Sequence, residues 1–322
     1  MNRGVWAFLF TVILGLSPDP AVADIPLVNI LTKTVSVRAE ALGGAGTALS
    51  GGPEMIWVNP ASASLDKSGW ELSLGGTRGS FDEITGGGML GFHAWDVEMF
   101  TGFSAYDAGL VTLNASDGTT RKVIGQRDFM GVAAISGDMG EAGRQGLQVL
   151  FMRSEFLEEF SARTVAASWG LRSDVSDAIS TGVSIRNFGP NLRYLDDIVT
   201  LPATGRAGVM FRSVLGTFWD APSDAPNQLR LVGDAEFAFA SSKVALLAGA
   251  ELQLGGILTL RGGGRIGQKG QLGAVSAGFG VDMGGLSKGD ADSRTRFRLD
   301  YAIRFMTGAF ELPHAFSLTM VF

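Results

Sequence analysis

Two stretches near the C-terminus decide the fold: Arg296-Phe-Arg-Leu-Asp-Tyr-Ala-Ile-Arg-Phe305 and Ala315-Phe-Ser-Leu-Thr-Met-Val-Phe322. In both stretches, large apolar residues occupy every second position. Because a strand points successive side chains to opposite faces, the first stretch has one apolar face and one face with four charges. This alternation, repeated along the chain and ended by an aromatic residue, is typical of an outer-membrane β-barrel, which is apolar toward lipid and polar toward its lumen.

The same period of two extends upstream to Trp70 and predicts an all-β chain whose strands form a transmembrane antiparallel β-barrel. We expect fourteen strands, near residues 70–78, 86–94, 97–106, 127–137, 145–155, 159–171, 177–188, 203–212, 228–240, 244–254, 257–266, 271–282, 294–305 and 313–322. A soluble sandwich of two sheets is the alternative that alternation alone leaves open, since such sheets also alternate polar and apolar faces.

Residues 24–68 do not alternate in this way. They are rich in small residues and contain the turn signal Gly51-Gly52-Pro53. We expect them to form an N-terminal plug inside the lumen of the barrel, which would comprise residues 69–322. The strands are joined by polar connections, of which the longest are expected at 108–126, 216–227 and 284–293. Because long loops of such barrels lie outside the cell, we expect these three on the outer side.

The N-terminus predicts export. Val5–Leu16 is apolar but shorter than the roughly 20 residues of a spanning helix, and it lies between Arg3 and the small-residue site Ala21-Val22-Ala23. We therefore expect residues 1–23 to be a signal peptide cleaved after Ala23, and the mature chain to reach the cell outer membrane. An uncleaved N-terminal anchor is the alternative.

Composition argues against several classes of function. The chain of 322 residues has a formal net charge of −6, no cysteine and two histidines. An acidic exported chain is a poor candidate for nucleic-acid binding, and the lack of cysteine disfavours thiol chemistry and soft-metal sites. Neither His93 nor His314 stands in a recognisable catalytic motif. We expect no enzyme activity, no cofactor and no metal. Gly262-Gly-Gly-Arg-Ile-Gly267 matches a dinucleotide motif but precedes a turn rather than a helix, so its glycines more simply allow close packing.

Several charged residues share the parity expected for the lumen. These predicted lumen-facing residues are Arg296, Arg298, Asp300, Arg304 and Glu251. They either line a polar conduit or pair with one another and with the plug, and pairing is the simpler reading.

Four motifs resemble the PorV/PorQ branch of the FadL-like outer-membrane β-barrels. The first two are Leu42-Gly-Gly-Ala-Gly-Thr-Ala-Leu49 and Ile56-Trp-Val-Asn-Pro-Ala61. The third is Val183-Ser-Ile-Arg-Asn-Phe-Gly-Pro-Asn-Leu192 followed by Leu201-Pro202, and the fourth is Leu299-Asp-Tyr-Ala302 with His314 and the final Phe322. The order of these motifs covers nearly the whole mature chain. The sequence departs from the pattern at Gly51-Gly52-Pro53-Glu54 and at Val58, where a second aromatic residue is usual.

The resemblance implies two functions. A PorV/PorQ-like barrel docks or shuttles exported proteins at the cell surface, as in type IX secretion, and its partners are cargo and cell-surface attachment proteins. The alternative is a FadL-like transporter, which moves hydrophobic small molecules through a plugged barrel.

Two groups of residues are candidate sites within this resemblance. The expected plug element consists of Trp57, Asn59 and Pro60. Either the Trp57 ring and the Asn59 side chain fix the plug in the lumen, or the whole turn simply packs against the inner wall.

Besides membrane lipid, the barrel-assembly machinery is an expected partner, because the closing strand resembles the signal that this machinery recognises. The outward-facing residues of that signal are Phe316, Leu318, Met320 and Phe322.

Overall fold

The computed structural model describes residues 29–33, 35–66, 69–79, 82–114, 118–195, 197–216, 225–267, 274–286, 295–306 and 312–322. The expected signal peptide and its cleavage site after Ala23 lie outside the described residues. Within these ranges, no helix has the length and apolar character needed to cross a membrane.

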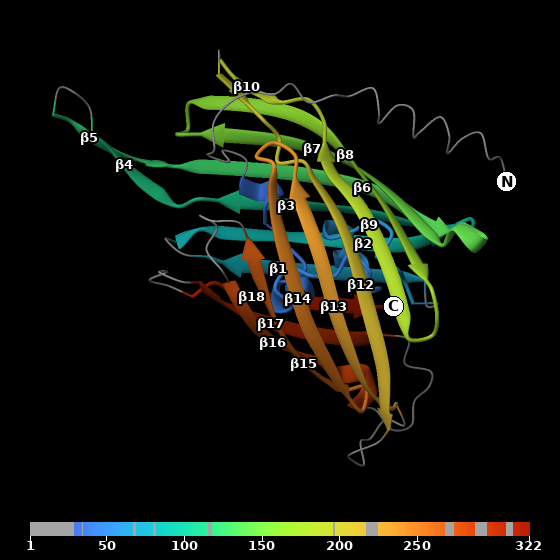
Figure 1. Cartoon of the computed structure of the whole chain (residues 1–322). Helices are drawn as coiled ribbons and strands as arrows, with labels where there is room; N and C mark the ends of the chain where they lie inside the picture. The colour runs from blue at the N-terminus through green and yellow to red at the C-terminus, as the bar shows by residue number, and fades with distance from the viewer. Residues whose placement is uncertain are drawn as a thin grey trace.

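Fourteen strands close into one antiparallel barrel, as the sequence predicts (Figure 1). They are β1 (Trp70–Arg78), β2 (Ile84–Ala94), β3 (Val97–Asp107), β6 (Gln126–Asp138), β7 (Arg144–Phe156), β8 (Phe160–Asp174), β9 (Ile179–Phe188), β12 (Thr204–Gly216), β13 (Asn227–Ala238), β14 (Lys243–Leu254), β15 (Leu258–Gly267), β16 (Ala274–Asp282), β17 (Arg296–Met306) and β18 (His314–Val321). The pairing of β1 with β18 closes the ring, so no barrel strand has an unpaired edge. The two-sheet sandwich is therefore excluded.

Two short hairpins lie outside the barrel sheet. They are β4 (Leu110–Asn114) with β5 (Thr120–Ile124), which projects from one end of the barrel, and β10 (Leu192–Tyr194) with β11 (Asp197–Val199) (Figure 1). The sequence predicts only connections in both segments. Their strands of three to five residues are too short to show a period of two.

The remaining regular elements are short helices. Three belong to the N-terminal part, η1 (Asn29–Leu31), α2 (Val37–Ala41) and η2 (Pro53–Trp57), and two lie between strands, η4 (Gly140–Ala142) and η5 (Met283–Leu286). Ser36 begins α2, and its hydroxyl accepts a hydrogen bond from the Ala39 amide at 3.3 Å, which is the usual N-cap arrangement.

The faces of the strands follow the predicted register. On β14, Leu246 is 59% exposed whereas its neighbour Leu247 is 2% exposed, and Glu251 on the same inner face is also buried. Large apolar side chains such as Phe316, Val275 and Phe211 stand on the outside around the barrel. A continuous exposed apolar surface of this kind is rare in water-soluble monomers and matches the lipid-facing band of a membrane barrel.

The long connections do not share one side, so that expectation is wrong. Because neighbouring strands are antiparallel, successive connections leave the barrel at alternate ends. The β3–β6 connection, which carries β4 and β5, lies at one end. The β12–β13 and β16–β17 connections leave from the opposite end, where β1 begins and β18 ends. We call this second end the terminal end of the barrel.

The chain lacks native cysteine, which permits a direct test of the faces. Cysteines introduced by Leu246→Cys and Leu299→Cys should react slowly with a charged, water-soluble thiol reagent in native membranes, because lipid covers these positions. Trp95→Cys, in the β2–β3 turn and 92% exposed, is the matched control and should react fast. Equal rates at all three positions would show that the apolar surface faces water.

Candidate functional site

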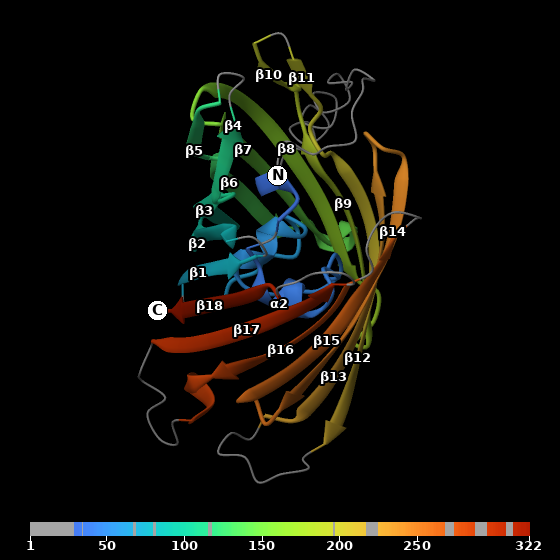
Figure 2. The same ribbon diagram turned by 90° about the vertical axis from the view of Figure 1, so that its left-hand side faces the viewer.

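Residues 29–33 and 35–66 lie inside the barrel, and we call them the lumenal segment (Figure 2). Nearly all side chains between Val35 and Ala63 are buried. The helix α2 packs mainly against β16 and β17. The described part of the expected plug thus occupies the interior of the barrel, in contact with strands that come much later in the sequence. That it closes the lumen to solutes stays a prediction.

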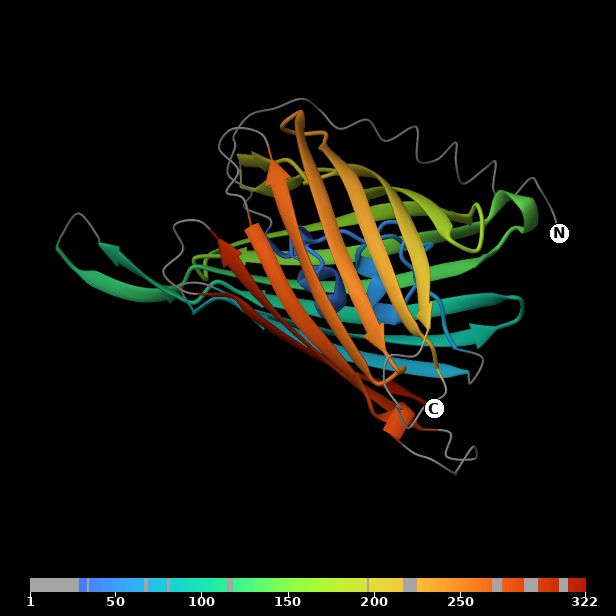
Figure 3. The ribbon, with the colours of Figure 1, turned by 60° about the horizontal axis from the view of Figure 1, so that its bottom comes forward.

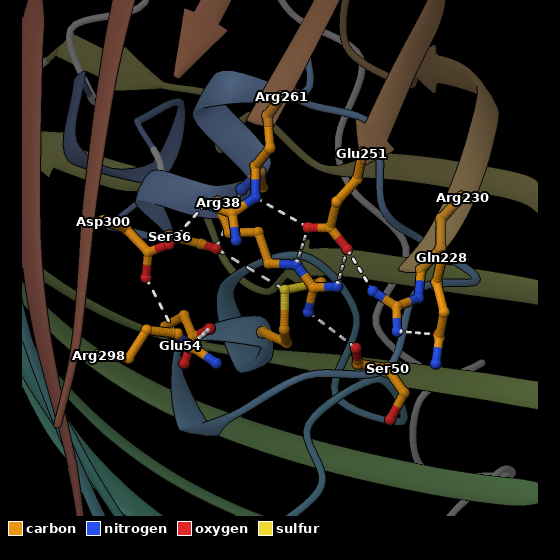
Figure 4. Close-up of polar contacts among 12 residues, drawn as sticks. Ser36, Arg38, Ser50, Glu54, Gln228, Arg230, Glu251, Arg261, Arg298 and Asp300 are labelled. Atoms are coloured by element: carbon orange, nitrogen blue, oxygen red, sulfur yellow. Dashed lines mark hydrogen bonds and ion pairs between the residues drawn. The ribbon is translucent and has the colours of Figure 1, made fainter. Parts of the chain in front are cut away.

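One buried carboxylate organises the charged side of the lumen. Glu251 on β14 is 1% exposed and accepts four hydrogen bonds from three guanidinium groups (Figure 4). Arg38 of α2 donates from Nε and Nη2 at 2.8 and 2.7 Å, while Arg230 and Arg261 donate at 2.8 Å each. A third hydrogen bond of Arg38, from Nη1 to the Ser50 carbonyl at 2.9 Å, joins two parts of the lumenal segment.

The same network continues to β17. Asp300 accepts a bond from Arg261 Nη1 at 2.5 Å and one from Arg298 Nε at 3.0 Å. Arg298 also donates from Nη2 to Glu54 of η2 at 3.0 Å (Figure 4). Carboxylates and guanidiniums therefore alternate from β13 to β17, with Arg38 and Glu54 supplied by the lumenal segment. Burial of so many charges is tolerated because each one has an opposite partner.

A second anchor lies on β12 and β13. Asp234 accepts hydrogen bonds from the Gly46 amide at 2.9 Å, the Thr47 amide at 3.0 Å and the Thr47 hydroxyl at 2.8 Å. Arg206 donates to the Gly44 carbonyl at 3.0 Å and pairs with Glu236. Buried backbone groups of the lumenal segment, which has little regular structure of its own, thereby find partners on the wall.

Glycines in the strands let the lumenal segment approach the wall. A Cβ added at Gly263 would overlap the carbonyl carbon of Leu42, and one added at Gly170 would overlap the Asn59 side chain. The 262–267 run therefore lies in strand β15, and its Gly263 allows the close packing that the sequence predicts, rather than forming a nucleotide site.

The expected plug element makes specific contacts with the wall. Asn59 donates to the carbonyls of Thr47 at 2.7 Å and Leu171 at 3.3 Å, and its Oδ1 accepts from the Ala61 amide at 3.0 Å. Pro60 lies against Gly146 of β7. The Trp57 ring packs in the buried apolar cluster, and its Nε1 has no hydrogen-bond partner among the described residues. Asn59 thus fixes this turn by polar contacts, whereas Trp57 contributes packing.

The predicted lumen-facing residues divide by depth. Glu251, Arg298 and Asp300 belong to the buried network, and Arg304 pairs with Glu40 of α2. Arg296 lies at the terminal end of β17, where its side chain is 44% exposed and pairs with Asp66. The structure therefore agrees with pairing rather than with an open polar conduit.

The closing strand places its predicted outward residues outside. Phe316 and Phe322 are exposed, and Leu318 and Met320 are partly exposed on the same face. Their recognition by the barrel-assembly machinery stays a prediction.

The middle of the opposite side of the lumen is apolar. Inward-facing residues of β2, β3, β6 and β7 form one buried cluster, made up of Met89, Phe100, Tyr106, Met130, Val132, Leu150 and Met152. We call this surface the apolar wall. Ile30 and Leu31 of the lumenal segment belong to the same cluster, as do Leu192 and Tyr194 of the β10–β11 hairpin. Barrels that form water-filled channels have polar interiors, so this wall is suited to apolar solutes.

Sequence reasoning missed the apolar wall because both faces of these strands are apolar. In Phe129-Met-Gly-Val-Ala-Ala-Ile135 the outward residues face lipid and the inward ones face the lumen, so the contrast between faces disappears. A run that is apolar throughout is itself the available signal, since it indicates a strand buried on both faces.

The Glu251 network should dominate the stability of the charged side. Glu251→Gln leaves three buried guanidiniums short of a counter-charge and should lower the free energy of unfolding by about 3–5 kcal/mol. The control is Asp82→Asn, which breaks an exposed pair with Arg78 and should cost about 0–1 kcal/mol. Urea unfolding in detergent micelles measures both, and equal losses would contradict this role of Glu251.

The close approach at Gly263 should be needed to hold the lumenal segment in place. Gly263→Ala should displace Leu42 at a cost of about 1–3 kcal/mol and speed amide hydrogen exchange in residues 37–49, measured by mass spectrometry. Gly233→Ala is the control, because a Cβ there meets nothing within 4 Å. Unchanged exchange in the Gly263→Ala variant would mean that the segment does not depend on this contact.

No protein-family model matches this sequence, and no curated protein sequence matches it either.

Solved structures do share the fold. The Pseudomonas putida toluene transporter TodX aligns over 90% of this chain and 97% of its own, with a TM-score of 0.61 and 11% identity. A TodX monoaromatic hydrocarbon channel deltaS2 mutant aligns over 93% and 98%, with a TM-score of 0.56 and 11% identity. A Pseudomonas aeruginosa FadL homologue aligns over 90% and 98%, with a TM-score of 0.52 and 10% identity. At these identities the likeness concerns the fold, and the chain has the fold of the FadL-like outer-membrane β-barrels.

Proposed function

We propose that this protein is an outer-membrane transporter of hydrophobic small molecules. The observation that carries the proposal is the apolar wall inside the barrel. Methionine, leucine and aromatic side chains cover the middle of the inner face of β2, β3, β6 and β7, where a pore for ions or sugars would expose polar groups. Buried polar groups such as Glu98, Arg144 and Asp128 lie toward the two ends of these strands. Apolar surface of this kind binds solutes whose own surface is driven out of water.

Location in the outer membrane is part of the proposal. The exposed apolar residues around the barrel require lipid rather than water as their surroundings. The expected signal peptide accounts for export, and the FadL-like fold is consistent with both export and insertion into the outer membrane. Two of the fold neighbours are a toluene transporter and a monoaromatic hydrocarbon channel. Aromatic hydrocarbons are therefore a sensible first class of solute to test.

Passage requires a movement inside the barrel. Ile30 and Leu31 of the lumenal segment and Leu192 of the β10–β11 hairpin pack in the same buried cluster as the apolar wall. A solute that binds this surface must replace some of these contacts. In Figure 3 the lumenal segment, in blue, is seen between the strands of the barrel.

Docking of exported proteins, which the PorV/PorQ resemblance implies, is a second candidate. The observation that favours it is the β4–β5 hairpin, which projects beyond the barrel and exposes Leu110 and Val111 (Figure 1). The other connection expected to dock partners, 216–227, leaves the terminal end. The two connections therefore cannot contact a partner on one side of the membrane, which makes docking the weaker candidate.

Uptake measurements on variants of the apolar wall test the transport function. Met152→Gln places a hydrated amide on this wall at a cost of about 1–3 kcal/mol to an apolar solute, and toluene uptake by proteoliposomes should fall by roughly tenfold or more. Met152→Leu, which keeps the wall apolar, should retain uptake.

Two further variants complete the test. Trp95→Gln is the control for the glutamine itself, because its position is an exposed turn. Deletion of residues 110–124 removes the projecting hairpin and should leave uptake intact. Uptake that is the same with and without the protein would contradict the transport function. Loss of export of other proteins on this deletion would support docking in its place.

A further inference from the structure

Two carboxyl groups meet where the lumenal segment reaches β1. The Glu54 side chain is 5% exposed, and its Oε1 accepts the bond from Arg298. Its Oε2 is buried and has no hydrogen-bond partner among the described residues. Glu71, the second residue of β1, is also buried, and its Oε1 accepts a bond from the Asp66 amide at 2.7 Å. Each carboxyl group thus has one oxygen that accepts a hydrogen bond and one oxygen that accepts none from the described residues.

The two remaining oxygens point to the same place. A Cβ added at Gly52 would lie 2.7 Å from Glu54 Oε2 and 3.1 Å from Glu71 Oε2. The oxygens are therefore separated by no more than the sum of these distances. Because residue 52 is glycine, no side chain stands between them. An orphaned buried oxygen in a native protein requires an explanation, and here the nearby group is a second carboxyl.

The surrounding charges do not neutralise both groups. Arg298 of β17 is shared between Glu54 and Asp300, and Arg38 of α2 is bound to Glu251. Two other charged or titratable groups interact with Glu71: Glu98 of β3, which pairs with Arg144, and His93 of β2, which is exposed. Two ionised carboxylates at this distance and depth repel each other strongly, and such pairs usually retain one proton between them.

We propose that Glu54 and Glu71 share one proton, in an O–H···O bond that fastens the lumenal segment to β1 at the terminal end of the barrel. Loss of the proton leaves two negative charges face to face, and the repulsion moves η2 away from β1. The lumenal segment is then held more loosely at high pH than at low pH. This inference does not rest on the nature of the solute and holds whatever the barrel transports.

The proton itself is the first observable. Infrared spectra of the protein in lipid at neutral pH should show the carbonyl band of a buried carboxylic acid. Glu71→Gln and Glu54→Gln should each remove it, because either change leaves a single carboxylate that accepts from the new amide. Absence of this band from the unmodified protein at neutral pH would overturn the proposal.

The loosening is the second observable. Ser62→Cys places a thiol in the buried lumenal segment of a chain without native cysteine, and its reaction with a neutral thiol reagent is followed from pH 5 to pH 9. The reference is the double variant that combines Ser62→Cys with Glu71→Gln, in which a permanent N–H donor replaces the shared proton. Because both proteins carry the same thiol, comparing their rates at each pH corrects for ionisation of that thiol. At high pH the protein with Glu71 should react about tenfold faster than the Glu71→Gln protein, and at low pH the two rates should agree.

A matched control and a competing occupant complete the design. Glu141→Gln, in the exposed helix η4, should leave the pH profile of the Ser62→Cys protein unchanged. A pH profile that is identical with and without Glu71→Gln would overturn the proposal. A profile that responds to calcium or to a chelator rather than to pH would also overturn it, and would assign the two carboxylates to a divalent cation.

Discussion

The bidentate ion pair between Arg38 and Glu251 is the contact on which the interior arrangement depends. It joins residues 213 positions apart in the sequence, and each of the two buried groups offsets the charge of the other. Arg230 and Arg261 complete the environment of Glu251 and extend the network to Asp300 and Arg298. Because these groups come from four strands and the lumenal segment, the network holds the segment in one position relative to the barrel.

The division of the lumen into two sides follows from this network. Most of the buried ion pairs lie on β12 to β17, where they hold the lumenal segment. The strands β2, β3, β6 and β7 carry apolar residues in the middle of their inner surface and the Glu98–Arg144 pair near the terminal end. Strong, directional ion pairs resist displacement, whereas apolar contacts are exchanged at low cost for other apolar contacts. A segment that is held on one side and packed by apolar contacts on the other is well suited to let a hydrophobic solute pass along the apolar wall.

Glu54 takes part in both the ion-pair network and the carboxyl pair. It belongs to the ion-pair network through Arg298 and to the carboxyl pair through Glu71, so a single side chain links the charged side to β1. Removal of a proton at this point weakens one end of the lumenal segment without breaking the Glu251 network. A local opening of this kind requires less free energy than release of the whole segment.

The sequence by itself determined the fourteen barrel strands and their faces, because alternation is a local property that each of these strands carries in its own residues. It also placed Glu251, Arg298 and Asp300 on the inner face. The tertiary structure alone decided which charges meet, since Arg38 reaches Glu251 only through the closed barrel and the course of the lumenal segment. The apolar wall and the pairing of Glu54 with Glu71 stayed hidden for the same reason. Strands that are apolar on both faces show no contrast, and a contact between distant residues leaves no periodic pattern. The ends at which the long connections lie, by contrast, follow from the order of the antiparallel strands, which the predicted series of fourteen strands already contained.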